Sequence, residues 1–209
     1  MEIKDAMQTS NTEKATTGNK FQEKFFEKVC YIIGDVAKIR NNITYTINVR
    51  GAEKETKSDV EVIFHHDNKT RFIFESTTSL RDDRFMAKDA QAEGIIKVLE
   101  DYGHQCVYCL VVPDDEYYTG KNAEKERHNN ELFADKINIQ RNVSQDNYKF
   151  LQMMFKESEA LAFVEYLKTL DKFDIPSIID VWRQKLKNDA IVKIQYQYPE
   201  MEQLSFFEM

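Results

Sequence analysis

The sequence predicts an α/β fold: a central mixed sheet flanked by helices, followed by a helical C-terminal half. Two observations lead to this fold class. In the first half, short runs rich in β-branched and aromatic residues alternate with longer stretches whose apolar residues recur at helical spacing. The chain has 209 residues, of which 42% are hydrophobic, which is enough for one packed domain and short for two.

Glycines and turn residues divide the first half into elements. Gly34 and Gly103 follow apolar helical patterns and are expected helix stops. The polar residues 67–69 provide turn chemistry between two strands, which predicts a hairpin. We expect a flexible polar arm over 1–18, a helix from Asn19 to Gly34, a strand over 43–49, a polar loop over 51–57, strands over 58–64 and 70–77, a helix over 84–102 and a strand over 107–112.

The second half is predicted to be mainly helical, and the sequence contains no internal repeat. We interpret residues 19–197 as a single domain and residues 198–209 as a loose tail. The expected elements are helices near 123–133, 146–155, 157–170 and 175–186, with a last strand over 191–196.

Composition excludes several classes of protein. No apolar run is long enough for a membrane helix, and residues 1–20 lack the apolar stretch of a secretory signal, so we expect a cytoplasmic protein with no membrane partner. Cys106 and Cys109 lie in a strand pattern, where residues three apart point to opposite faces, so we interpret them as core cysteines rather than zinc ligands. The net charge of −7 argues against a protein that coats nucleic acid, but not against a nuclease with a metal site.

Two acidic residues are predicted to meet across the hairpin. Val60 and Val62 share one face of the first strand, which leaves Asp59 on the other face. By the same alternation Glu75 lies on that face of the second strand, and the short turn brings it opposite Asp59 or within a residue or two. Like charges held this close are costly unless something compensates them. Mg²⁺, for which Mn²⁺ substitutes, suits such oxygen ligands; a pair of solvated strand-edge carboxylates is the alternative.

These residues resemble a known nuclease core. Ser-Asp-Val-Glu-Val, a hairpin turn, and then Phe-Glu-Ser-Thr-Thr-Ser-Leu-Arg are similar to the PD-(D/E)XK restriction-endonuclease-like superfamily, in which a strand Asp is followed by (D/E)-x-K on the next strand. The order of elements over residues 19–113 matches as well. The resemblance implies a restriction-endonuclease-like core, with Asp59 and Glu75 as catalytic, metal-holding acids and double-stranded DNA as the substrate.

The sequence departs from that pattern at the lysine, where it has Thr77. Type IIS restriction enzymes and related nicking enzymes are similar here, which implies activity without the lysine and a catalytic role for Thr77 in positioning water or metal. Positive charge would come from Arg81, Arg84 or Lys88, which are nearest in sequence and are also candidate DNA contacts; solvated surface positions are the alternative for all three.

A third acid and one polar residue are further candidates for the site. Phe-Glu-Lys-Val at 26–29 resembles the stretch that opens this superfamily, which makes Glu27 a candidate metal ligand, although an exposed charged helix face explains it equally. Gln91, on the helix after the motif, is the other candidate.

We therefore predict a metal-dependent DNA endonuclease, most simply a type II restriction endonuclease or a subunit of one. A single site cuts one strand, so a homodimer or a heterodimer with a recognition subunit is expected. The alternatives are an inactive DNA-binding or assembly protein, and a repair or mobile-element nuclease. The last alternative draws on residues 203–207, Gln-Leu-Ser-Phe-Phe, which resemble the pentapeptide by which bacterial proteins bind the sliding clamp, except for Phe206 where Leu is usual. Gln203, Leu204, Phe206 and Phe207 would make the contacts; packing of the two phenylalanines onto this domain or into a dimer is the alternative.

Overall fold

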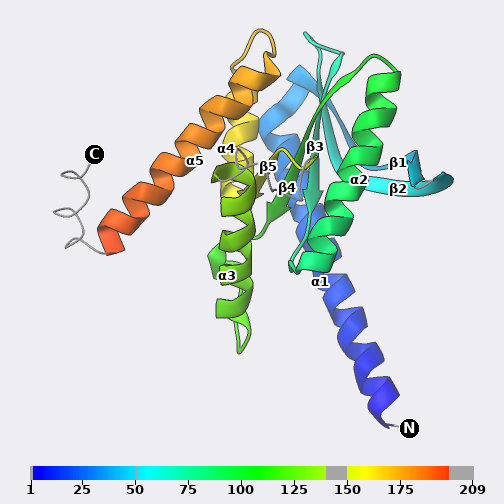
Figure 1. Ribbon diagram of the computed structural model, residues 1–209, viewed down its shortest axis with the longest axis vertical. Coiled ribbons are helices and arrows are strands. Elements are labelled where there is room, and N and C mark those ends of the chain that lie inside the picture. The colour runs from blue at the N-terminus through cyan, green and yellow to red at the C-terminus, as the bar shows by residue number, and fades with distance from the viewer. Residues whose placement is uncertain (1, 50, 140–149, 198–209) are drawn as a thin grey trace. The chain divides into compact units, whose positions relative to one another are not determined.

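The computed structural model describes the backbone of residues 2–49, 51–139 and 150–197 (Figure 1). Over these residues the chain alternates strands with helices in the first two thirds and ends in two helices. In chain order the elements are α1 (Glu2–Ile33), η1 (Gly34–Val36), β1 (Ala37–Val49), β2 (Ala52–Phe64), β3 (Thr70–Ser76), α2 (Asp82–Asp101), β4 (Gln105–Val112), η2 (Asp115–Tyr117), α3 (Ala123–Ala134), the π-helical η3 (Asp135–Ile139), β5 (Met153–Lys156), α4 (Glu157–Lys168) and α5 (Ile175–Gln197).

The described strands form one mixed sheet in the order β1-β2-β3-β4-β5. β1, β2 and β3 are antiparallel neighbours, whereas β3, β4 and β5 run parallel. Val60 of β2 is paired with Phe74 of β3, and Phe74 is paired with Cys109 of β4. The hairpin between β2 and β3 closes through Asp67, whose carboxylate accepts hydrogen bonds from the backbone of Lys69 and Thr70.

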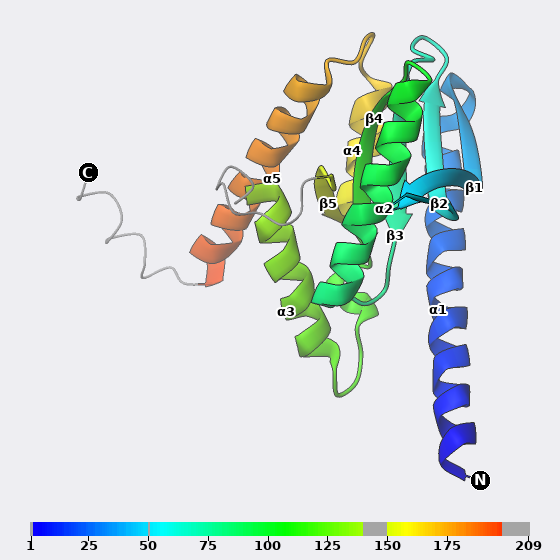
Figure 2. The same cartoon turned by 45° about the vertical axis from the view of Figure 1, so that its right-hand side comes forward.

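Helices cover both faces of the sheet, which confirms the predicted α/β class (Figures 1 and 2). On one face, Phe25 of α1 packs edge-on against Phe74 with ring centroids 5.9 Å apart, and Phe163 of α4 contacts the same ring. On the other face, Phe85 of α2 stacks on Phe133 of α3 at 4.2 Å. The residues of each strand therefore divide between an α1/α4 side and an α2/α3 side.

In the long hairpin of β1 and β2, the alternation of side chains between the two sheet faces shifts by one residue near the middle of β1. The pairing is interrupted at Asn42 and Asp59, and Asn42 has a left-handed backbone with φ of 52°. Arg40 and Tyr45 both reach Glu61, although residues five apart point to opposite faces in a regular strand. The left-handed residue thus changes which side chains of β1 point to each face, so that Tyr45 and Ile47 face α2.

The predicted elements around the hairpin are confirmed. The structure has the expected helix ending before Gly34, the strands at 43–49, 58–64, 70–77 and 107–112, and the helices at 84–102, 123–133 and 157–170, with boundaries shifted by a few residues. Cys106 and Cys109 are buried core residues, as expected.

Four segments differ from the sequence predictions. Residues 2–18 belong to α1 instead of a flexible arm, and residues 52–57 extend β2 instead of forming a loop. The predicted helix over 146–155 is wrong at its end, because residues 153–156 form β5; its start lies outside the described residues. The predicted strand at 191–196 is also wrong, because α5 continues through it.

The chain falls into two compact units, residues 1–173 and 174–209, whereas the sequence suggested one domain from 19 to 197. In the second unit the Asp174 carbonyl accepts the N–H of Ile178 at 2.9 Å, and the Asp174 carboxylate accepts the Ser177 hydroxyl at 2.6 Å. These two bonds fix the first turn of α5. The predicted clamp-binding residues 203–207 lie outside the described part of the chain. Among the helices described, none combines the length and apolar character that crossing a membrane requires.

Gly94 lets the hairpin lie directly against α2. A Cβ atom at this position would be 2.8 Å from Ile47 Cδ1 and 2.9 Å from Ile47 Cβ, closer than carbon atoms approach. The glycine interrupts a helix in which alanine is otherwise preferred by about 1 kcal/mol. Close packing on β1 explains why the helix tolerates it.

We predict that Gly94→Ala destabilises the protein by about 1–3 kcal/mol, the usual cost of overpacking. The free energy of unfolding in urea measures the effect. Ala90→Gly, at an exposed position of the same helix, is the matched control and should cost only the helix propensity of about 1 kcal/mol. A Gly94→Ala protein more stable than the wild type would contradict the packing that the structure describes.

Candidate metal centre on the sheet

Asp59 and Glu75 lie side by side on the α2 side of the sheet. The register of β2 and β3, continued by one residue from the Val60–Phe74 pair, puts them opposite each other. The backbone N–H of Ser76 donates to Asp59 Oδ2 at 2.7 Å, which ties the two acids to one point of the hairpin. Glu75 is 2% exposed and Asp59 is partly buried. The structure thus places the two carboxylates next to each other, as the sequence predicted.

Three side chains from two other elements hold Glu75. Lys88 of α2 forms an ion pair with Oε1. Oε2 accepts hydrogen bonds from Tyr108 of β4 at 3.2 Å and from Gln91 of α2 at 3.3 Å. Gln91 also donates to the carbonyl oxygen of Lys57 at 2.7 Å and so links α2 to β2. The carboxylate is fixed in orientation by groups of α2 and β4.

The surroundings of Asp59 oppose its ionisation. Burial, and next the negative charge of Glu75, raise the pKa of Asp59 from its ordinary value of 3.8 to about 7. The Ser76 N–H and the Lys88 ammonium act in the opposite direction, with smaller effects. A cation beside both carboxylates would relieve this repulsion.

A second buried carboxylate on the same sheet face is neutralised differently. Glu61 is fully buried and is ion-paired with two arginines, Arg40 of β1 and Arg71 of β3. The Tyr45 hydroxyl donates to it at 2.9 Å. With two cations and a hydroxyl on one carboxylate, Glu61 is part of the packing and offers no free ligand.

The other predicted residues of the motif have different surroundings. Thr77 is buried, and its hydroxyl donates to the Ser79 carbonyl at 3.2 Å, so its described bond closes the loop after β3. Arg84 donates to the carbonyl and hydroxyl of the same Ser79, at 3.1 and 2.8 Å. Arg81 is 68% exposed and pairs with Asp83 at 3.4 Å, which leaves it at the surface.

The structure does not bring Glu27 to the acidic pair. α1 packs on the sheet through Phe25 and Phe74, which is the face opposite Glu75, and Glu27 is exposed on that helix.

Sequence reasoning listed Lys88 only as a basic residue near the motif, and it missed Tyr108. The spacing of Lys88 and Gln91 is a signal that was available: residues three apart share one helix face, and both interrupt the apolar side of α2. For Tyr108 the signal is weaker. It lies in an apolar strand pattern, and only the rule that a buried tyrosine hydroxyl needs a partner points to the site.

The residues present fit a magnesium ion held by few protein ligands. Mg²⁺ typically takes one or two carboxylates and completes its shell with water and substrate phosphate. Asp59 and Glu75 are two such donors. In the described part of the chain, no group of three or more His, Cys, Asp or Glu is arranged to hold a metal. Two carboxylates are fewer than the four protein ligands of a closed structural site and match the small number that Mg²⁺ takes from a protein.

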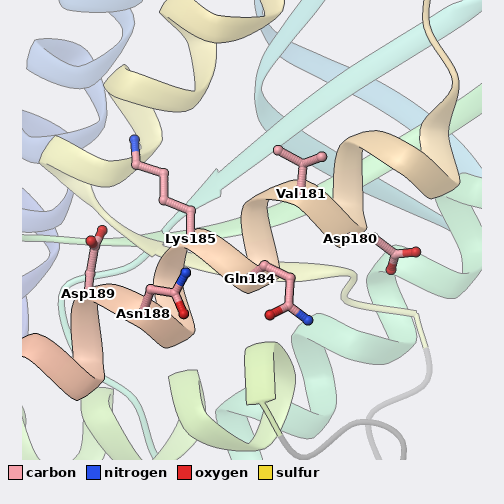
Figure 3. A pocket seen from close by; sticks show the side chains of 6 residues that line it. All are labelled: Asp180, Val181, Gln184, Lys185, Asn188 and Asp189. Atoms are coloured by element: carbon pink, nitrogen blue, oxygen red, sulfur yellow. The ribbon is translucent and has the colours of Figure 1, made fainter.

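A separate hollow on α5 shares no residue with this centre. Figure 3 shows its lining, which comes entirely from that helix and includes two exposed acids. The residues are Asp180, Val181, Gln184, Lys185, Asn188 and Asp189. Water stabilises the charge of exposed carboxylates such as these, so they do not require a bound cation. We assign the hollow no role.

The chain is similar in structure to two solved proteins. No protein-family model matches the chain, and no curated protein matches it. The solved structure of protein VC1899 from Vibrio cholerae is similar over 70% of this chain and 32% of its own, with 16% identity and a TM-score of 0.40. The small subunit (R.BspD6I2) of the heterodimeric restriction endonuclease R.BspD6I is similar over 82% of this chain and 89% of its own, with 8% identity and a TM-score of 0.36. The chain thus spans about a third of the Vibrio protein, and at these TM-scores neither likeness carries an argument about function.

We predict that the metal-free protein loses stability as the pH rises from about 4 to about 7. In that range folded Asp59 keeps a proton that the unfolded chain has already released, so the folded state binds more protons and the free energy of unfolding falls with pH. The full effect is about 4 kcal/mol at most. Urea unfolding in EDTA across this range measures it. Asp59→Asn has no such proton to lose, so the difference between the two proteins should grow with pH; a constant difference would refute the raised pKa.

Proposed function

We propose that the protein is a magnesium-dependent DNA endonuclease, a type II restriction endonuclease or a subunit of one. The observation that carries the proposal is the ion pair of Lys88 with Glu75 beside Asp59. Two acids and a lysine are the group that the sequence motif calls for, with the lysine supplied by α2 in place of the strand position that Thr77 occupies. The resemblance of the hairpin sequence to the PD-(D/E)XK superfamily supports the same assignment.

In this proposal Asp59 and Glu75 hold Mg²⁺ in the substrate complex. The bound ion would polarise the phosphodiester and lower the pKa of a water molecule for attack. Tyr108 and Gln91 keep Glu75 in a fixed orientation, so that its charge is preorganised rather than rearranged during the reaction. Lys88 supplies positive charge next to the phosphate that is cut.

The surface around the motif fits a contact with the DNA backbone. Arg81 is exposed at the start of α2, and the partly exposed Lys88 lies seven residues, about two helical turns, further along. Such charges bind phosphates without reading sequence. Recognition and double-strand cleavage would need a second copy or a partner subunit, because one centre cuts one strand.

We expect the purified full chain to nick or cut plasmid DNA in Mg²⁺ or Mn²⁺ and to be inactive in EDTA. Asp59→Asn and Glu75→Gln should each lower the rate by about 100-fold or more, since each removes a charged metal ligand. Agarose gel assays on supercoiled plasmid measure the rates. Glu27→Gln is the matched carboxylate control and should keep wild-type activity, because Glu27 lies on the opposite face of the sheet. A folded Asp59→Asn or Glu75→Gln protein with full activity would remove the assignment.

We also predict that Lys88→Met lowers cleavage by about 100-fold, in the range seen when a group that stabilises transition-state charge is lost. Thr77→Lys, added to Lys88→Met, should restore part of the activity by returning an ammonium from the strand. Lys97→Met is the control, because Lys97 is exposed on the same helix and pairs with Glu93 instead. If wild type and Thr77→Lys are both inert on every form of DNA while metal binding is confirmed, the protein is a binding module and not a nuclease.

A further inference from the structure

We propose that Lys88 is a removable internal counter-ion: in the metal-free protein its ammonium occupies Glu75 Oε1, and it must leave that oxygen before the metal can bind there. Metal loading would then be an exchange of one cation for another. This inference rests on the proposed magnesium centre and adds a second role for the same lysine.

The distribution of partners on Glu75 singles out one oxygen. Oε2 is held by two neutral donors, Tyr108 and Gln91, of which Tyr108 is buried in the sheet. Oε1 has Lys88 as its described partner. A metal ion that approaches Glu75 can therefore gain an oxygen by displacing one flexible side chain, with the other two bonds left in place.

The contrast with Glu61 indicates that the choice of lysine matters. Glu61 is held by Arg40 and Arg71, whose planar guanidinium groups offer several donors in a fixed geometry. Glu75 lies on the same face and is nearly as deeply buried, yet its cation is a lysine, a single charge on a four-carbon stem. In the proposed exchange, a lysine is the easier of the two cations for a metal ion to displace.

Lys88 also has room to move. The Lys88 side chain is 22% exposed and the Glu75 side chain 3% exposed, so the lysine reaches the carboxylate from the solvent side of α2. The nearby Arg84 is engaged with Ser79 and does not compete for Glu75 among the described contacts. Once displaced, the Lys88 ammonium is available to a DNA phosphate, which would favour the metal-loaded form when substrate is present.

The experiment titrates the DNA-free full chain with Mn²⁺ at pH 8, with free Mn²⁺ followed by electron paramagnetic resonance. If the lysine blocks Oε1 in nine of ten molecules, Lys88→Met should bind Mn²⁺ about tenfold more tightly than the wild type. Lys88→Arg should bind more weakly than the wild type, because a guanidinium is harder to displace. Arg84→Met removes the same charge one helical turn away and should change the affinity less than about twofold, by screened electrostatics alone.

The outcomes separate this inference from the proposed function. Lys88→Met that binds Mn²⁺ no more tightly than the wild type, or Arg84→Met that tightens binding equally, would overturn the exchange while leaving cleavage of DNA by the wild type intact. Tighter binding by Lys88→Met together with an inert wild type would support the exchange and refute the nuclease. No Mn²⁺ binding by any folded variant would overturn both. If Lys88→Met does not fold, as judged by circular dichroism, the ranking of Lys88→Arg below the wild type decides the question.

Discussion

The repulsion between Asp59 and Glu75 is the constraint around which this part of the molecule is organised. Two carboxylates on neighbouring strands, one almost fully buried, would ionise together only at a high cost in free energy. The chain offsets this cost with groups from three elements: the backbone of β3, the Tyr108 hydroxyl of β4, and the side chains of Lys88 and Gln91 on α2. The pKa of Asp59 remains raised despite these partners, so the compensation is incomplete, and the proposed magnesium ion would complete it.

The position of α2 decides whether that compensation reaches the acids. At one point the helix lies directly on β1, because Gly94 has no side chain to hold Ile47 away. Near its middle, the Asp89 carboxylate accepts the backbone N–H groups of Phe150 and Leu151 at 2.8 Å each, which fastens the helix to the chain that leads into β5. Lys88 is the residue before this anchor. The packing of the helix therefore sets the distance from Lys88 to Glu75. A change in the Gly94–Ile47 contact or in the hydrogen bonds of Asp89 would alter that distance.

The acidic pair could be predicted from the sequence because strand alternation and a short turn are local patterns. Asp59 and Glu75 follow from counting residues along one hairpin. The errors occurred where local patterns carry less information. Residues 52–57 are polar because they lie in an exposed arm, and they form a strand because β1 pairs with them. Residues 191–196 have the composition of a strand but continue a helix. Lys88 lies thirteen positions beyond Glu75, and only the packing of α2 on the sheet reveals which of the nearby cations reaches the acid.

Lys88 reaches Glu75 from helix α2 and not from position 77 after β3, which Thr77 occupies. Position 77 directly follows β3, and Thr77 is 8% exposed there. From α2 the same ammonium arrives over the edge of the site, with more of its side chain exposed than that of the glutamate it binds. Its position relative to the acids is then set by a flexible stem rather than by the strand. Glu61, on the same sheet face, is paired instead with two arginines, whose guanidinium groups have a fixed planar geometry. In the proposed exchange, the identity of the cation matters more than its position along the chain, because Glu61 is paired with arginines and Glu75 with a lysine.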